Sequence, residues 1–220
     1  MNREDIRDAL RELCPEITDR VLTDTQLNTL LKIGDKDFCA RTRCITNYDP
    51  ETISTTANDT FWDLTTEISK YYDVDEFPGG GISYNNERLD LKTIAQLDEI
   101  DSGWRTASAG TPEYYFRRGP RIYTNCPIDS NADDIKVYAV LISNDFDSDP
   151  KTPFNELTYL EPFHFGLVLW LVWKGKVKIG KREDALTAMQ EYVEYAKWVK
   201  KELGGTKYSE IYFRPKNNIY

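Results

Sequence analysis

The sequence predicts a mainly α-helical protein with a small inserted antiparallel β-sheet, organised as a helical bundle with an extended C-terminal arm. Three observations lead to this fold class. Apolar residues recur at helical spacing near both ends of the chain, the middle third changes to strand-like segments separated by turn residues, and a Gly-Gly pair precedes the last fifteen residues. We therefore expect a body over residues 1–205, with a β region inserted at 62–143, and an arm over 206–220.

Four helices are expected in the body, over residues 3–13, 23–45, 157–174 and 182–203. The first ends at Cys14 because Pro15 disfavours a helical conformation in the residue before it. The second begins at a capping residue, Thr23 or Asp24, and Gly34 weakens its middle. The third is apolar on nearly every side, which predicts burial against several neighbours, and the Gly-Gly pair is expected to end the fourth.

The middle of the chain predicts short strands and hairpins. Residues 48–59 form a polar run without a period and are expected to be a loop, followed by a strand over 64–72. Asn85-Asn86 tolerate positive φ and so predict a tight hairpin turn, and Gly119-Pro120 predict a second one. A short helix is expected at 93–100 and a buried strand at 135–142, in a small antiparallel sheet.

Composition limits the possible classes of protein. The chain has 220 residues with 40% hydrophobic and 13% aromatic side chains, enough for a core, and a formal net charge of −9. That charge disfavours a general binder of nucleic acid or anionic membranes. The longest apolar run, Leu167–Trp173, is too short to span a membrane, and no signal-peptide pattern follows the charged N-terminal residues. We expect a soluble protein in a reducing compartment.

The sequence predicts neither a metal site nor a cofactor. The four cysteines form no CxxC pair and lie far along the chain from His164, the only histidine, so buried free thiols are expected rather than zinc ligands. Asp145, Asp147 and Asp149 lack the glycine and distal glutamate of a calcium loop. His164 begins the most apolar helix, which favours a buried or capping histidine over a catalytic one. No enzyme is predicted.

Three stretches resemble one protein family. The first runs from Asn85 through the expected hairpin and helix to the Gly-Trp-Arg at 103–105. The second is GTPEYYF at 110–116, followed by Arg121-Ile122-Tyr123, Cys126-Pro127 and KVYA at 136–139. The third comprises Pro-Phe-His at 162–164 and Glu-Asp-Ala at 183–185. In order and spacing these are similar to the head-to-tail adaptor, or connector, proteins of tailed and mainly short-tailed bacteriophages.

The resemblance covers roughly residues 1–205 and implies a structural virion protein. It implies a homo-oligomeric ring of twelve copies below the portal, joining the capsid portal to the tail, with the genome passing through its lumen. The implied partners are the portal protein, further copies of the chain, and tail, nozzle or fibre proteins, with DNA passing without specific binding. The chain departs from the family pattern in Phe165 after His164, where a small residue is usual, and in the glycine loop at 79–81.

The implied function agrees with the charge of the chain. A channel through which DNA slides should hold few phosphates, and −9 per subunit would make a ring electronegative. Many cytosolic enzymes carry a similar charge for solubility, so charge alone does not decide the function.

The C-terminal arm is expected to need a partner. Large apolar or aromatic side chains gather in a tail too short to bury them by itself. An arm that docks on a neighbouring subunit or on the portal would cover them, whereas the alternative is that it folds back on its own body. The expected interface residues are Tyr208, Ile211, Tyr212, Phe213, Arg214 and Tyr220.

A basic segment between the last two expected helices has two interpretations. It carries Lys174, Lys176, Lys178, Lys181 and Arg182 without aromatic residues interleaved among the cations. It is either a solvated turn whose cations complement the end of the preceding helix, or a contact with an acidic portal surface or with DNA.

Other functions remain as alternatives. The chain could be another ring of the virion neck or tail, such as a head-completion or tail-terminator protein, which would be equally small and acidic. It could also be a small cytosolic enzyme with a pocket between the bundle and the sheet. That enzyme would depend on His164.

Overall fold

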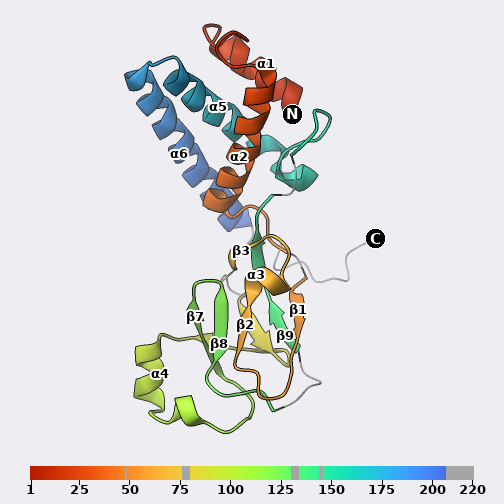
Figure 1. The fold of residues 1–220 in the computed structure, drawn as a ribbon, viewed down its shortest axis with the longest axis vertical. Helices are drawn as coiled ribbons and strands as arrows, with labels where there is room; N and C mark the ends of the chain where they lie inside the picture. Colours follow the sequence, from red (N-terminus) through yellow and green to blue (C-terminus); the bar gives the residue numbers. More distant parts are fainter. Residues whose placement is uncertain (48, 76–79, 130–133, 144–145, 207–220) are drawn as a thin grey trace. The chain divides into compact units, whose positions relative to one another are not determined.

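The computed structural model describes residues 1–47, 49–75, 80–129, 134–143 and 146–206. Contacts divide the chain into two compact units (Figure 1). The first, which we call the helical unit, comprises Met1–Ile45 together with Ile142–Tyr220. The second, the β unit, comprises Thr46–Leu141. The β unit is thus inserted into the sequence of the helical unit.

The helical unit is built around α5. The four main helices are α1 (Arg3–Leu13), α2 (Asp24–Thr42), α5 (Phe165–Lys178) and α6 (Arg182–Thr206). Two 3-10 turns, η2 (Phe154–Glu156) and η3 (Thr158–Phe163), precede α5. α5 contacts α1, α2 and α6, in agreement with its apolar sequence. Capping boxes begin α1 and α2, formed by Asn2 with Asp5 and by Thr23 with Gln26.

Two glycines allow α5 to approach α2 closely. A Cβ on Gly34 would lie 2.5 Å from Cδ1 of Trp170, and a Cβ on Gly166 would lie 2.3 Å from Cε2 of Phe38. The Trp170 ring is held there by its Nε1, which donates to the Leu30 carbonyl at 2.9 Å. A glycine at position 34 lowers the helix propensity of α2, but it allows the Trp170 ring to pack against the helix.

The β unit contains three small sheets. Their strand orders are β1-β9-β4-β5, β2-β8-β7-β6 and β10-β3. The strands are β1 (Glu51–Ser54), β2 (Phe61–Asp63), β3 (Tyr71–Val74), β4 (Ile82–Tyr84), β5 (Glu87–Arg88), β6 (Asp90–Leu91), β7 (Tyr114–Arg118), β8 (Arg121–Thr124), β9 (Asp134–Val137) and β10 (Ala139–Leu141). The helices are α3 (Leu64–Glu67), α4 (Ile94–Ile100) and the 3-10 turn η1 (Trp104–Thr106).

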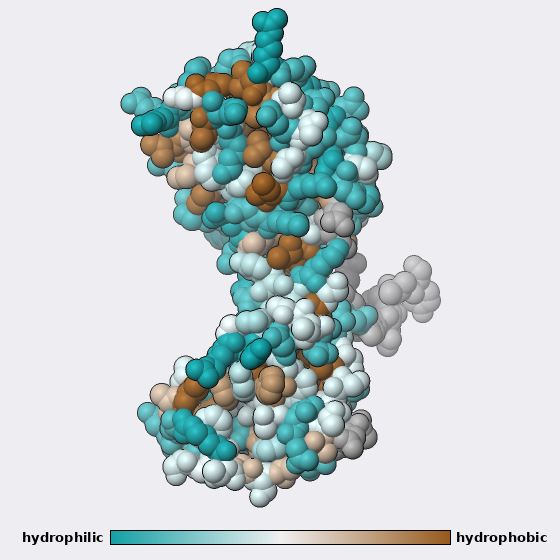
Figure 2. Space-filling view, in the orientation of Figure 1, coloured by the Kyte–Doolittle hydropathy of each residue, from teal (hydrophilic) through white to brown (hydrophobic). Residues whose placement is uncertain are grey.

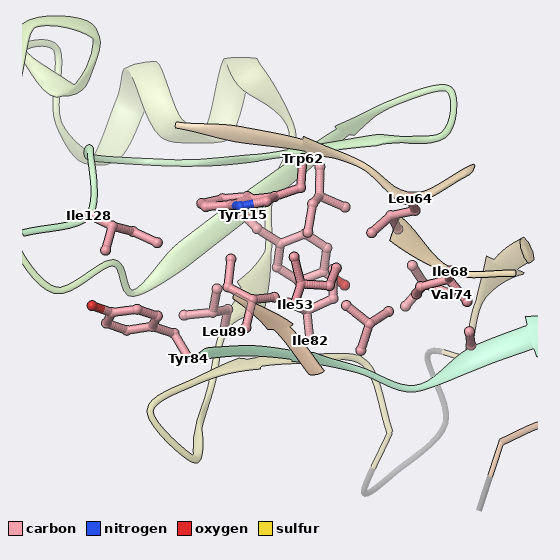
Figure 3. Close-up of a cluster of buried hydrophobic side chains, with 14 residues drawn as sticks. Ile53, Trp62, Leu64, Ile68, Val74, Ile82, Tyr84, Leu89, Tyr115 and Ile128 are labelled. Carbon is pink, nitrogen blue, oxygen red and sulfur yellow. The ribbon is translucent and has the colours of Figure 1, made fainter. Parts of the chain in front are cut away.

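One hydrophobic cluster joins these sheets. Trp62 and Tyr115 lie next to each other in it, with Tyr84, Leu89 and Ile128 towards one end of the cluster (Figure 3). Tyr115 is 1% exposed and Trp62 is 5% exposed. Short strands from distant parts of the sequence therefore share one core.

The predicted fold class is wrong. The described residues are 47% helical and 19% strand, with sheets of four, four and two strands, rather than a mainly helical bundle carrying one small sheet. β1 and β2 were not predicted because they are four and three residues long, too short to show alternation. The expected strand over 135–142 breaks at Tyr138, so that β9 and β10 join different sheets.

Several local predictions also need correction. The segment at 48–59 contains β1, and residues 64–67 form a helix rather than a strand. The sheets are not wholly antiparallel, because β6 pairs parallel with β7. The helix expected from 157 begins at Phe165 after 3-10 turns that contain Pro162, and α6 continues through Gly204 to Thr206. The two predicted hairpins are confirmed, with positive φ at both Asn85 and Asn86 and at Gly119.

Candidate interaction surfaces

The basic segment at the end of α5 is largely satisfied within the helical unit. Lys176 hydrogen-bonds Glu16, and Lys181 lies 3.3 Å from the same carboxylate. The Lys176 hydrogen bond lowers the pKa of Glu16 to about 2. Lys174 lies over two indole rings, its Nζ 4.2 Å from the Trp170 centroid and 3.5 Å from that of Trp173.

Three of the five predicted basic residues are exposed, and of these Lys181 pairs with Glu16. Lys178 and Arg182 are exposed, and among the described residues no ion pair holds either side chain. The five cations therefore do not form one free basic surface, and the charge available to an external anion comes mainly from these two.

The predicted interface residues of the arm lie outside the described residues. These are Tyr208, Ile211, Tyr212, Phe213, Arg214 and Tyr220. The described chain leads to them through α6, which ends at Thr206.

His164 is a buried residue of the helical unit. It is 1% exposed, its Nδ1 accepts a hydrogen bond from the Met1 ammonium at 3.0 Å, and its ring meets the edge of Phe154. Burial lowers its pKa to about 4, so the imidazole is neutral at pH 7. Within the described part of the chain its Nε2 has no hydrogen-bond partner. Nothing in this arrangement pairs the ring with a nucleophile.

The carboxylates of the segment before η2 serve as structural anchors. Asp149 accepts a hydrogen bond from Arg7 Nη1 at 2.9 Å, and Asp147 lies 2.8 Å from Lys151. Among the described residues no group of three or more metal-ligating side chains could hold an ion. In the same part of the chain, no helix is long and apolar enough to cross a membrane.

The four cysteines are buried free thiols, as predicted. The sulfur atoms of Cys39 and Cys44 lie 3.7 Å apart, although the two residues are five positions apart in the sequence. The reason is Arg43, which adopts a left-handed conformation with φ of 56°, ends α2 and turns the chain back.

The β unit carries a row of aromatic rings on the sheet formed by β2, β8 and β7. Phe61, Tyr123 and Phe116 stack in sequence, with centroids 5.6 Å and then 4.9 Å apart. Trp104 of η1 meets Phe116 edge-on at 5.4 Å. We call these four residues the aromatic row. Arg121 lies over Phe61 at one end, and Arg105 lies over Trp104 at the other.

A pocket opens beside the aromatic row. It has a volume of about 200 Å³, and Trp104, Phe116 and Tyr123 form its apolar wall. Thr60, Arg105 and the segment Thr124–Pro127 complete the lining. Arg105 pairs with Asp98, to which Trp104 Nε1 also donates at 2.8 Å, so the rim is fixed by a local network. This pocket lies wholly within the β unit.

A second aromatic surface belongs to the helical unit. Trp198 meets Phe163 edge-on at 5.8 Å and lies 5.4 Å from Tyr195, which in turn meets Phe165. Trp198 is 47% exposed and Phe165 is 42% exposed. Figure 2 shows that hydrophobic residues, in brown, reach the surface of this unit among hydrophilic ones.

The aromatic row was not predicted, although the second predicted hairpin contains the signal for part of it. A two-residue turn at Gly119-Pro120 pairs Arg118 with Arg121 and therefore Phe116 with Tyr123. Phe61 could not be added in this way, because β2 was not predicted and its pairing with Tyr123 depends on tertiary contacts.

The model of the SU10 adaptor protein family matches residues 1–207. The chain belongs to the SU10 adaptor protein family. Among curated proteins no match is found. Membership makes the chain a structural component of a phage virion that interacts with other virion components, and it confirms the resemblance seen in the sequence.

Proposed function

We propose that this chain is a head-to-tail adaptor that forms a homo-oligomeric ring of twelve copies below the portal. The ring joins the capsid portal to the tail and lines the channel through which DNA passes. The observation that carries the proposal is the family match over residues 1–207. The protein is made in the host cytoplasm and acts in the neck or tail region of the virion.

Two properties of the described residues support a structural rather than a catalytic role. The only histidine is buried and neutral, and its ring contacts Phe154 and the Met1 ammonium rather than a nucleophile. The basic segment is held mostly by Glu16 and two indole rings, so it offers DNA few phosphate contacts. A channel that lets DNA slide needs such weak contacts.

The body over residues 1–205 forms the ring, and the arm over 206–220 docks on the portal or on a neighbouring subunit. The arm carries four aromatic side chains and one arginine, and these residue types are enriched among the hot spots of protein interfaces. Tail, nozzle and fibre proteins attach to the assembled ring.

Light scattering behind a sizing column tests this proposal. We expect the purified chain, mixed with its portal, to form a complex with one adaptor per portal subunit. Removal of residues 206–220 should abolish attachment to portal-bearing heads while the circular dichroism of the body is unchanged. A chain that ignores the portal but caps isolated tails would instead be a tail-terminator, and turnover lost on His164→Ala would indicate an enzyme.

A further inference from the structure

The pocket beside the aromatic row has a size that suits a single side chain of a protein partner. Small-molecule sites enclose about 300–1,000 Å³, whereas this pocket has a volume of about 200 Å³. Its wall is aromatic, and the adjoining Phe61 is 49% exposed, so the row continues onto the surface. Buried aromatic anchors surrounded by polar groups are typical of protein interface hot spots.

Acidic side chains lie near the Cys126 side of the pocket. Cys126 lines it, and Asp129 and Glu113 lie near enough to add to the effect of burial in raising the pKa of that thiol. Asp98 and Asp63 pair with the two arginines at the ends of the aromatic row. The β unit as a whole has 17 acidic and 8 basic residues, a net charge of −9. A partner segment that combines aromatic side chains with positive charge would complement this surface.

The chain itself contains such a segment directly after α6. Residues 207–220 carry three basic residues and one acidic residue, and four of the fourteen are aromatic. Within them Tyr212-Phe213-Arg214 places an aromatic pair next to a cation. Fourteen residues span up to about 45–50 Å when extended, enough to reach a neighbouring molecule.

We propose that residues 207–220 of one copy dock on the aromatic row of a second copy, with Phe213 or Tyr212 in the pocket and Arg214 towards Asp129 and Glu113. This inference rests on the ring of the proposed function, since a ring supplies a neighbouring β unit for every arm. The segment therefore links subunits to each other, and the helical unit of its own chain is not its receptor.

Site-specific photocrosslinking in the full chain tests the inference. p-Benzoylphenylalanine replaces Phe213, equal amounts of isotopically heavy and light protein are mixed, and the products of irradiation are mapped by mass spectrometry. We expect heavy-to-light crosslinks that join position 213 to residues 104–127, with a yield that rises with protein concentration.

Thr60 provides a matched pair of variants. It is exposed at the pocket, and its carbonyl accepts the Thr124 backbone N–H, a bond that substitution of the side chain retains. Thr60→Tyr should fill the pocket and lower the crosslink yield at 104–127 at least tenfold, whereas Thr60→Ala should leave it unchanged. Phe165→Ser, in the second aromatic surface, should also leave it unchanged.

Two results would overturn the inference. One is a crosslink that stays at 104–127 in full yield with Thr60→Tyr, and the other is a crosslink to residues 159–198 or to the portal in place of the β unit. If either occurs while the chain still joins the portal in light scattering, the docking inference fails and the adaptor function stands. If the chain forms the crosslink but never binds a portal, the docking inference stands and the proposed function fails.

Discussion

The helical unit and the β unit differ most clearly in charge. The helical unit has 20 acidic and 20 basic residues and is neutral, whereas the β unit has 17 acidic and 8 basic residues and accounts for the whole net charge of −9. If the channel of a ring is electronegative, the β unit must face the DNA, because this unit carries the whole net charge. Helical units lining the channel would also bind phosphates weakly, but because they carry no net charge.

The two units also differ in how they are held together. The helical unit has helices of up to 25 residues whose backbones approach closely at Gly34 and Gly166. The β unit has strands of two to five residues, each with few backbone hydrogen bonds, around a core in which two large aromatic residues lie side by side. Loss of one large side chain should therefore affect the β unit strongly and locally.

The largest effect is expected from Tyr115→Ala in the β unit. Tyr115 is 1% exposed and central to the cluster in Figure 3, and truncation of such a ring typically costs about 4 kcal/mol in the free energy of unfolding. Hydrogen exchange should accelerate over residues 46–141 and stay unchanged in α1, α2, α5 and α6. Tyr72→Ala, at a 43% exposed residue of β3, is the control and should change stability little. Equal acceleration in both units would show that they unfold as one.

A smaller effect, confined to the helical unit, is expected from Asp35→Asn. Asp35 is 1% exposed, accepts the Phe154 N–H at 3.0 Å, and has a pKa raised by burial to about 6. Its ionisation costs stability as pH rises through about 4 to 6, by about 3 kcal/mol at pH 7. An asparagine keeps the acceptor oxygen without the charge, so the variant should be more stable at pH 7, by up to that amount.

Because of His164, the stability of the Asp35→Asn variant should also depend on pH in a different way. The pKa of His164 is lowered by burial to about 4, so its contribution to stability is present above about pH 6.5 and is lost as pH falls towards 4. In the native chain this loss is opposed by the gain from protonating Asp35. Urea unfolding at several pH values should therefore show a steeper loss of stability below pH 6.5 in Asp35→Asn than in the native chain. The exposed Glu4→Gln should behave like the native chain, and a pH profile unchanged by Asp35→Asn would contradict this account.

The difference between the two units also explains which parts of the fold the sequence could predict. The helix expected over 3–13 is α1 at those bounds, and the Asn85-Asn86 turn is where it was expected, because capping boxes and positive-φ turns are local signals. Strands such as β6, which pairs parallel with β7 over two residues, are set by tertiary contacts. Gly204 did not end α6, since a glycine permits a helix to stop but does not force it to.

The candidate surfaces show the same difference between local signals and tertiary contacts. The basic segment was visible as five cations in a row of nine residues, but Glu16, which binds two of them, lies 160 residues earlier in the sequence. The aromatic row forms only where a hairpin, the strand β2, which was not predicted, and the 3-10 turn η1 come together. Local composition thus identified the charges, whereas only the fold shows which of them are already paired.

The smallest effects are expected from alanine substitutions at three glycines. Gly166→Ala places a methyl group 2.3 Å from the buried Phe38 ring, which is stacked on Phe154 and cannot move freely, so we expect a loss of about 2 kcal/mol. Gly204→Ala in α6 and Gly110→Ala in the β unit meet nothing within 4 Å. Gly204→Ala should stabilise the chain by about 0.5–1 kcal/mol through helix propensity, and Gly110→Ala should be nearly neutral. Thermal unfolding of the three variants measures this order. A Gly166→Ala protein as stable as the native chain would mean that α5 can withdraw from α2, and that close packing is not what distinguishes the helical unit.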